Sequence, residues 1–156
     1  MTSHQKFMQR ALDLAVRSAK KGTGPFGCVV VKNGKVIAEG WNQVTQLFDP
    51  TAHAEVQAIR KACKALKDYQ LTGCTLYASS FPCPQCLGAI YWARPKEVYY
   101  LNTADQAAKI GFDDRFIYSE FTKPNARRKY PLKRLSLPHA LAAFEAWEKN
   151  PSKKVY

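Results

Sequence analysis

Two short stretches decide the fold, Thr51-Ala52-His53-Ala54-Glu55 and Phe81-Pro82-Cys83-Pro84-Gln85-Cys86. The first offers an imidazole and a carboxylate, and the second offers two thiols three positions apart. One imidazole and two thiolates suit Zn²⁺, and three protein ligands leave its fourth position open for water. A carboxylate beside that position can take a proton from the water, as metal-assisted hydrolysis requires. The two stretches therefore predict a catalytic zinc site with Glu55 as its proton acceptor.

A purely structural zinc site is the main alternative for these residues. Such a site normally closes with a fourth Cys or His. His4, His139 and three further cysteines are available, but none lies near the two stretches in sequence, and a structural site has no use for Glu55. One geometric question stays open, because residues i and i+2 on a helix point about 200° apart. His53 and Glu55 can therefore both reach a metal only from the start of a helix.

Working outward from these stretches, the apolar periodicity predicts alternating helices and strands up to Asn102. Asn33-Gly34 lies between two short apolar runs and predicts a tight hairpin turn. Ser3 and Thr51 are predicted as N-caps of the helices that they begin or precede. The expected helices and strands are Ser3–Lys20, Phe26–Val31 (strand), Val36–Asn42 (strand), Ala52–Leu66, Thr75–Ser79 (strand), Pro84–Ala93 and Glu97–Leu101 (strand), with a polar loop at Gln43–Pro50. This order predicts an α/β fold with helices packed on the faces of a sheet.

The pattern loosens after Asn102. We expect short helices at Ala104–Ile110 and Asp113–Ser119, an extended segment at Leu132–Leu135, and a helix at His139–Lys149. The last six residues, 151–156, form a basic tail that composition alone would describe as a disordered end.

Length and composition predict one soluble domain of 156 residues without a membrane span or secretion signal, and a cytoplasmic location. Cys28, Cys63 and Cys74 are expected to be small buried hydrophobic residues and not disulfide partners. The net charge of +12 is partly concentrated between Lys123 and Arg134. A solvated loop is the favoured interpretation of that segment, because aromatic residues there are few. A nucleic-acid footprint is the alternative.

Residues 51–60 (TAHAEVQAIR) and 82–95 (PCPQCLGAIYWARP) resemble the cytidine and deoxycytidylate deaminase superfamily, whose H-x-E and P-C-x-x-C motifs they reproduce. Residues 111–118 (GFDDRFIY) and the ending Lys-Lys-Val-Tyr resemble the bacterial guanine deaminases within it. The resemblance covers essentially the whole chain. It implies a three-layer α/β/α fold with a mixed sheet, and a deaminase domain over residues 1–156.

The resemblance also implies a reaction and a set of zinc ligands. Guanine would be hydrolysed to xanthine and ammonia, with one Zn²⁺ per subunit held by His53, Cys83 and Cys86. Glu55 would carry a proton from water to the purine ring and then to the leaving amine.

The substrate-binding residues implied by the resemblance are Asn42, Ala54 (through its backbone), Asp114, Tyr156, Phe26 and Trp92. Each has a plainer interpretation. An asparagine such as Asn42 is ordinarily a turn residue, and Asp113-Asp114 would ordinarily be a helix cap or partners for an arginine. Phe26 and Trp92 would ordinarily be core residues. The family further implies a homodimer in which the tail 151–156 is exchanged, so that Tyr156 closes the partner's pocket.

One position departs from the family pattern. Relatives often carry Glu before the P-C-x-x-C motif, where this chain has Phe81. Phe81 is not a metal ligand, so the chemistry should survive while the pocket wall differs. The rival functions are a tRNA adenosine deaminase, which would suit the basic surface, a cytosine deaminase, and a zinc-stabilised RNA-binding module, which leaves Glu55 unexplained.

Overall fold

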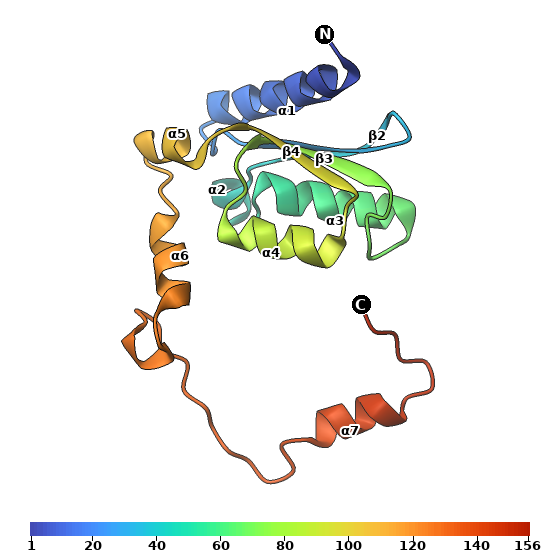
Figure 1. Cartoon of the computed structure of the whole chain (residues 1–156), viewed down its shortest axis with the longest axis vertical. Helices are drawn as coiled ribbons and strands as arrows, with labels where there is room; N and C mark the ends of the chain where they lie inside the picture. Colours follow the sequence, from blue (N-terminus) through green and yellow to red (C-terminus); the bar gives the residue numbers. More distant parts are fainter. The chain divides into compact units, whose positions relative to one another are not determined.

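The computed structural model describes residues 1–156, which form two compact units, Met1–Phe116 and Ile117–Tyr156 (Figure 1). The first unit contains all the strands. Its elements are α1 (Ser3–Lys20), β1 (Gly27–Lys32), β2 (Lys35–Trp41), α2 (Val44–Leu47), α3 (Ala54–Leu66), β3 (Cys74–Ser80), α4 (Pro84–Ala93), β4 (Glu97–Asn102) and α5 (Ala104–Lys109).

The four strands form one mixed sheet in the order β2-β1-β3-β4. β1 runs antiparallel to both β2 and β3, whereas β3 and β4 are parallel. The β1–β2 hairpin turns at Asn33 and Gly34, whose φ angles of 50° and 72° are those that a two-residue turn of this type needs. The predicted hairpin and mixed sheet are confirmed.

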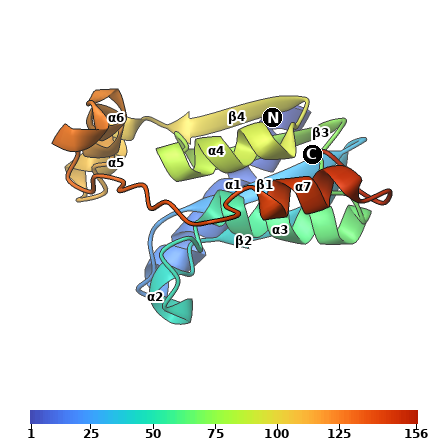
Figure 2. The same cartoon turned by 90° about the horizontal axis from the view of Figure 1, so that it is seen from below.

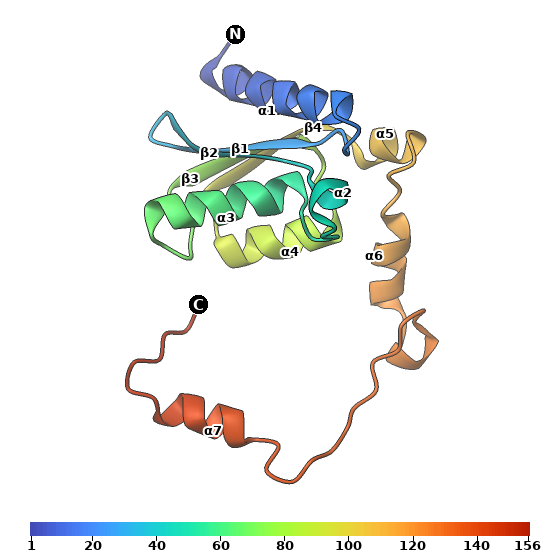
Figure 3. The same ribbon diagram turned by 180° about the vertical axis from the view of Figure 1, so that it is seen from behind.

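Helices cover both faces of the sheet. Figures 1 and 3 show α1 on one face and α3 and α4 on the other, and Figure 2 shows α3 and α4 side by side. Alternate strand residues point to opposite faces, so Val29 and Tyr77 pack under α1 while Val30 and Leu76 pack under α3 and α4. The predicted three-layer arrangement is therefore confirmed.

Three local predictions are wrong in detail. α1 is capped by Thr2, which forms a capping box with Gln5, and not by Ser3. The loop expected at Gln43–Pro50 contains the short helix α2. α3 begins at Ala54 with His53 as its N-cap, two residues later than predicted.

Helix α6 (Arg115–Thr122) begins in the first unit and continues into the second. The second unit also contains the 3-10 turn Asn125–Arg127 and α7 (Ala142–Lys149). The extended segment expected at Leu132–Leu135 joins no sheet, and the last helix begins three residues later than predicted, after His139 at φ 58°. None of the side chains in this unit is buried. The unit therefore has no hydrophobic core of its own.

The burial of Cys28, Cys63 and Cys74 can be compared with the prediction that they are small buried residues. Cys28 and Cys74 are buried and Cys63 is partly buried, and all five thiols are free. No helix combines the length and apolar character needed to cross a membrane.

Candidate active site

The starts of α3 and α4 bring the predicted metal ligands together. His53 is the N-cap of α3, and Cys83 is the N-cap of α4. Cys86 lies in the first turn of α4, which Pro84 opens at a position where its missing N–H costs nothing. The Nδ1 atom of His53 lies 3.4 Å from Sγ of Cys83 and 3.5 Å from Sγ of Cys86, and the two sulfur atoms are 3.6 Å apart.

These separations fit a tetrahedral zinc site. Zn–S bonds of about 2.3 Å and Zn–N bonds of about 2.0–2.1 Å give tetrahedral edges of about 3.8 Å between two sulfurs and about 3.5 Å between sulfur and nitrogen. The three edges of His53, Cys83 and Cys86 match within about 0.2 Å. No other histidine, cysteine or acidic group joins this cluster. Three ligands with one open position are typical of a catalytic zinc site and not of a structural one.

The position of Glu55 resolves the question of its spacing from His53. As the N-cap, His53 has an extended backbone (φ −71°, ψ 158°) and lies outside the helical rotation, while Glu55 lies in the first turn. Both side chains can therefore face the same site. Oε2 of Glu55 accepts a hydrogen bond from Sγ of Cys86 at 3.3 Å.

The ionisation of the cluster follows from these contacts. Hydrogen bonds from Cys86 and from His53 lower the pKa of Cys83 to about 4, so Cys83 is a thiolate at neutral pH. The hydrogen bond with Cys83 raises the pKa of Cys86, and burial raises it further. The hydrogen bond to Cys83 also raises the pKa of His53. The pair of sulfurs thus holds one proton, which a metal ion must displace.

Glu55 has the environment of a proton carrier. Only 7% of its surface is exposed, and burial raises the pKa of its carboxyl group. A carboxyl group that ionises closer to neutrality can both accept and return a proton. The structure contains no lysine or arginine paired with it.

Asn42 is both a turn residue and a candidate ligand. It follows β2, is 6% exposed, and its Oδ1 atom accepts a hydrogen bond from the backbone N–H of Val44 at 3.2 Å. The plainer interpretation is therefore correct for Oδ1, whereas the Nδ2 group takes no part in that hydrogen bond. Ala54 is fully buried at the first position of α3, where its N–H has no partner within the helix.

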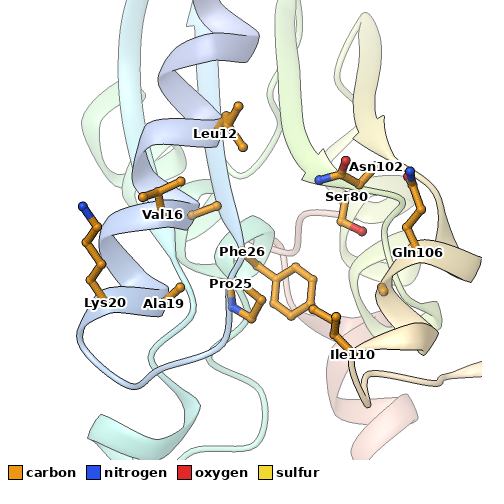
Figure 4. A pocket seen from close by; sticks show the side chains of 12 residues that line it. Leu12, Val16, Ala19, Lys20, Pro25, Phe26, Ser80, Asn102, Gln106 and Ile110 are labelled. Carbon is orange, nitrogen blue, oxygen red and sulfur yellow. The ribbon is translucent and has the colours of Figure 1, made fainter.

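Phe26 packs against Phe112, which lies in the segment 111–118 that resembles the guanine deaminases. Its ring packs edge-on to the ring of Phe112, with centroids 4.9 Å apart. Figure 4 shows Phe26 pointing toward Ile110 across a cavity of about 300 Å³ between α1 and α5. Phe112 was given no role from the sequence, although it lies inside the Gly111–Asp114 part of the motif that signals guanine deaminases.

The two neighbouring aspartates have different surroundings. Asp113 accepts hydrogen bonds from the backbone N–H and the guanidinium of Arg115, which lower the pKa of Asp113 to about 2. Burial and then the charge of Cys83 raise the pKa of Asp114. Asp113 is therefore a partner of Arg115, which is one of its two plainer interpretations, whereas Asp114 is close enough to Cys83 for that charge to act on its carboxyl group.

Three further positions have exposed side chains. Trp92 is 62% exposed near the end of α4, about 13 Å along the helix axis from Cys83. Tyr156 is 66% exposed and belongs to the second unit. Phe81 is partly exposed and packs edge-on to Tyr100, with centroids 5.1 Å apart. Neither Trp92 nor Phe81 is a buried core residue.

Comparison with known proteins gives consistent matches. Residues 1–102 match the family described as the cytidine and deoxycytidylate deaminase zinc-binding region. The chain is 54% identical to a guanine deaminase of Bacillus subtilis over 99% of both chains. An X-ray structure of guanine deaminase from Bacillus subtilis matches with a TM-score of 0.96, 54% identity, and coverage of 100% of this chain and 99% of that one.

A second class of relative matches over a shorter length. A tRNA-specific adenosine deaminase of Aquifex aeolicus is 42% identical over 94 residues, which are 60% of this chain and 62% of that protein. The zinc-binding cluster, the sheet and these matches agree, and the chain belongs to the cytidine and deoxycytidylate deaminase zinc-binding family.

Proposed function

We propose that this protein is a zinc-dependent guanine aminohydrolase, which converts guanine and water to xanthine and ammonia. The observation that carries the chemistry is the convergence of His53, Cys83 and Cys86 on three edges of a tetrahedron, with buried Glu55 in contact with Cys86. Zinc bound there would supply an acidified water as the nucleophile. One zinc ion per subunit satisfies this set of ligands.

The protein's own contribution to the reaction is mainly proton transfer. Glu55 would accept a proton from water and pass it to the purine ring, and would then move the proton of the newly added hydroxyl to the amine so that it leaves as ammonia. The new bond joins the water oxygen to the ring carbon, and the bond that breaks joins that carbon to the amino nitrogen. An amine attached to an aromatic ring leaves poorly until it is protonated, so one carboxyl group must act as base and then as acid.

Substrate choice is supported by residues outside the zinc motifs. Asn42 would donate from Nδ2 to an acceptor on the purine, because Oδ1 is already bonded to Val44. Asp114 would accept from the N–H groups that guanine presents at its amino edge. Phe26 would contact a ring face, and Ala54 would contribute its backbone N–H.

The length over which each relative aligns with this chain favours guanine over tRNA as the substrate. The guanine deaminase of Bacillus subtilis aligns over 99% of the chain, including the second unit, whereas the tRNA-specific relative aligns over 60%. A free base needs a closed pocket, while a tRNA loop needs an open channel. The segment beyond the shared zinc region is therefore the part expected to close the pocket.

The second unit suggests how closure happens. Its 40 residues, 117–156, contain no buried side chain, and exposed apolar residues such as Leu135, Phe144 and Val155 need a surface to cover them. We propose a homodimer in which this segment is exchanged and Tyr156 closes the partner's site. The five free thiols favour a cytoplasmic location, where they stay reduced.

A substrate panel tests the proposal. The purified protein is incubated with guanine, adenine, cytosine and guanosine, and also with a tRNA anticodon stem-loop, and released ammonia is measured. Guanine is expected to be the preferred substrate, with xanthine formed in equal amount. Turnover of the tRNA or of cytosine without turnover of guanine would replace the substrate assignment and leave the zinc chemistry standing.

A further inference from the structure

Gly40 lies where α3 approaches the sheet most closely. It is a buried residue near the end of β2, paired with Cys28 of β1. A Cβ atom at Gly40 would lie 2.2 Å from the carbonyl oxygen of Ala54 and 2.6 Å from the backbone nitrogen of Ala58. Both are main-chain atoms, so no side-chain rotation can relieve the overlap. The first turn of α3 therefore rests directly on the backbone of β2.

The atoms that touch Gly40 belong to the catalytic segment. The carbonyl of Ala54 is part of the peptide bond that continues into Glu55, and Ala54 directly follows His53. A displacement of this peptide would carry both side chains with it.

Other contacts hold the same helix to β2 and the segment after it. The backbone N–H of Gln43 donates to the carbonyl of Ala52 at 2.9 Å, and Nε2 of Gln57 donates to Oε1 of Gln43 at 3.2 Å. Further along α3, Nζ of Lys61 donates to the carbonyl of Glu39 at 3.0 Å. These hydrogen bonds, which join residues before and after Gly40 to α3 and the segment preceding it, restrict the movement of α3 away from a bulkier residue at position 40.

We propose that Gly40 is a positioning residue for deamination, because the absence of a side chain there sets the depth at which His53 and Glu55 enter the site. The inference rests on the proposed function. Restoring an ordinary contact from 2.2 Å requires a shift of about 1 Å in the first turn of α3. A misplacement of about 1 Å can cost roughly a hundredfold in rate.

Gly27 provides a matched control on the opposite face of the sheet. A Cβ atom at Gly27 would lie 2.2 Å from the carbonyl oxygen of Ala11 and 2.7 Å from the backbone nitrogen of Ala15. The overlap is as severe, and it again involves the backbone of a helix. That helix is α1, which carries none of the candidate zinc ligands or Glu55. Gly27→Ala therefore imposes the same packing defect without displacing His53 or Glu55.

The test compares Gly40→Ala with Gly27→Ala in the full chain. Three quantities are measured for each: zinc affinity by competition with a chelator, the absorption spectrum of the cobalt-substituted protein, and kcat and KM with guanine. For Gly40→Ala, zinc affinity should fall roughly ten- to a hundredfold, the cobalt spectrum should shift, and kcat should fall about a hundredfold. For Gly27→Ala, the thermal midpoint should fall comparably while zinc affinity, the cobalt spectrum and kcat stay within about threefold of the parent.

Equal losses in the two variants, or an unchanged cobalt spectrum in Gly40→Ala, would overturn the proposal. If Gly40→Ala does not accumulate as folded protein, Ala58→Ser enlarges the buried residue whose backbone nitrogen and Cα lie against Gly40, one turn along α3 from Ala54, and should give smaller changes in the same direction. If the parent protein fails to deaminate guanine, the proposed function fails, while zinc affinity and the cobalt spectrum still decide the role of Gly40.

Discussion

Glu55 contacts the metal-ligand cluster through Cys86: its Oε2 atom lies 3.3 Å from Sγ of Cys86. The two residues come from the first turns of different helices, α3 and α4, which the chain brings together at one end of the sheet. A buried carboxyl group beside zinc ligands is useful to a hydrolase and expensive for a structural site. This contact therefore separates a catalytic interpretation from a structural one.

Replacing Glu55 with glutamine tests that distinction. The amide keeps the size of the side chain but cannot take a proton, so kcat for ammonia release should fall by about 10²- to 10⁴-fold. Zinc content, measured by atomic emission, should remain at that of the parent. Glu97→Gln removes an exposed carboxylate on β4 and should behave as the parent does. Full activity in Glu55→Gln would leave the binding-module alternative standing.

Cys86→Ser should abolish tight zinc binding. Serine keeps the shape but replaces a thiolate ligand with a poor oxygen ligand, and only His53 and Cys83 of the three-residue group remain. Zinc per chain after dialysis should drop to near zero, and activity should drop with it. Cys63→Ser alters a thiol outside the cluster and should retain its zinc. Retention of zinc by Cys86→Ser would show that the ligand set is wrong.

Asp114→Asn tests recognition of the purine. Asp114 is half-buried, and loss of one acceptor that a bound base would cover costs about 1–3 kcal/mol, so kcat/KM for guanine should fall between about tenfold and a hundredfold. The neighbouring variant Asp113→Asn breaks the pairing with Arg115 but leaves Asp114 in place, and kcat/KM should change little. Steady-state kinetics of the two variants decide between them, and the reverse order of effects would move the recognition role to Asp113.

Deleting residues 151–156 tests the role of the tail. We expect turnover of guanine to fall strongly while zinc content is unchanged, because the tail contains no zinc ligand. Replacing Lys153 and Lys154 with glutamine removes the tail's charge but keeps Tyr156, and turnover should be retained. Kinetics unaffected by the deletion would refute the assignment of Tyr156.

A mixing experiment then tests whether closure comes from the partner. The tail-deleted chain has an intact Glu55, and the Glu55→Gln chain has an intact tail. Refolding the two inactive chains together should restore part of the activity if each site takes its tail from the partner. Activity that stays at the level of the separate chains would place the tail in its own subunit's site.

The sequence was sufficient to predict that His53, Cys83 and Cys86 come together and where the four strands lie along the chain, because both follow from local patterns. Ligand spacing at two helix starts and alternating apolar runs need no knowledge of distant contacts. The start of α3 was predicted two residues too early for a specific reason. Thr51 was expected to cap that helix, but its N–H and hydroxyl both bond to Oδ1 of Asp49, at 2.8 and 2.7 Å. That turn leaves His53 as the N-cap, which is what lets it share a site with Glu55.

The substrate residues were harder to predict because their surroundings come from distant segments. The exposure of Trp92 depends on which side of α4 faces the sheet, and the apolar pattern of α4 runs around most of the helix. The close approach of Gly40 to Ala54 joins two elements that no local pattern connects. Leu132–Leu135 was expected to be extended, and in the structure it belongs to no helix or strand.

The central claim, zinc-dependent deamination of guanine, is tested most directly by metal depletion and reloading. The protein is stripped with a chelator, given guanine, and followed for xanthine and ammonia before and after zinc is added. The account predicts almost no product from the stripped protein and, after one equivalent of zinc per chain, xanthine and ammonia in a one-to-one ratio. Undiminished turnover without zinc, or no xanthine after full reloading, would contradict it.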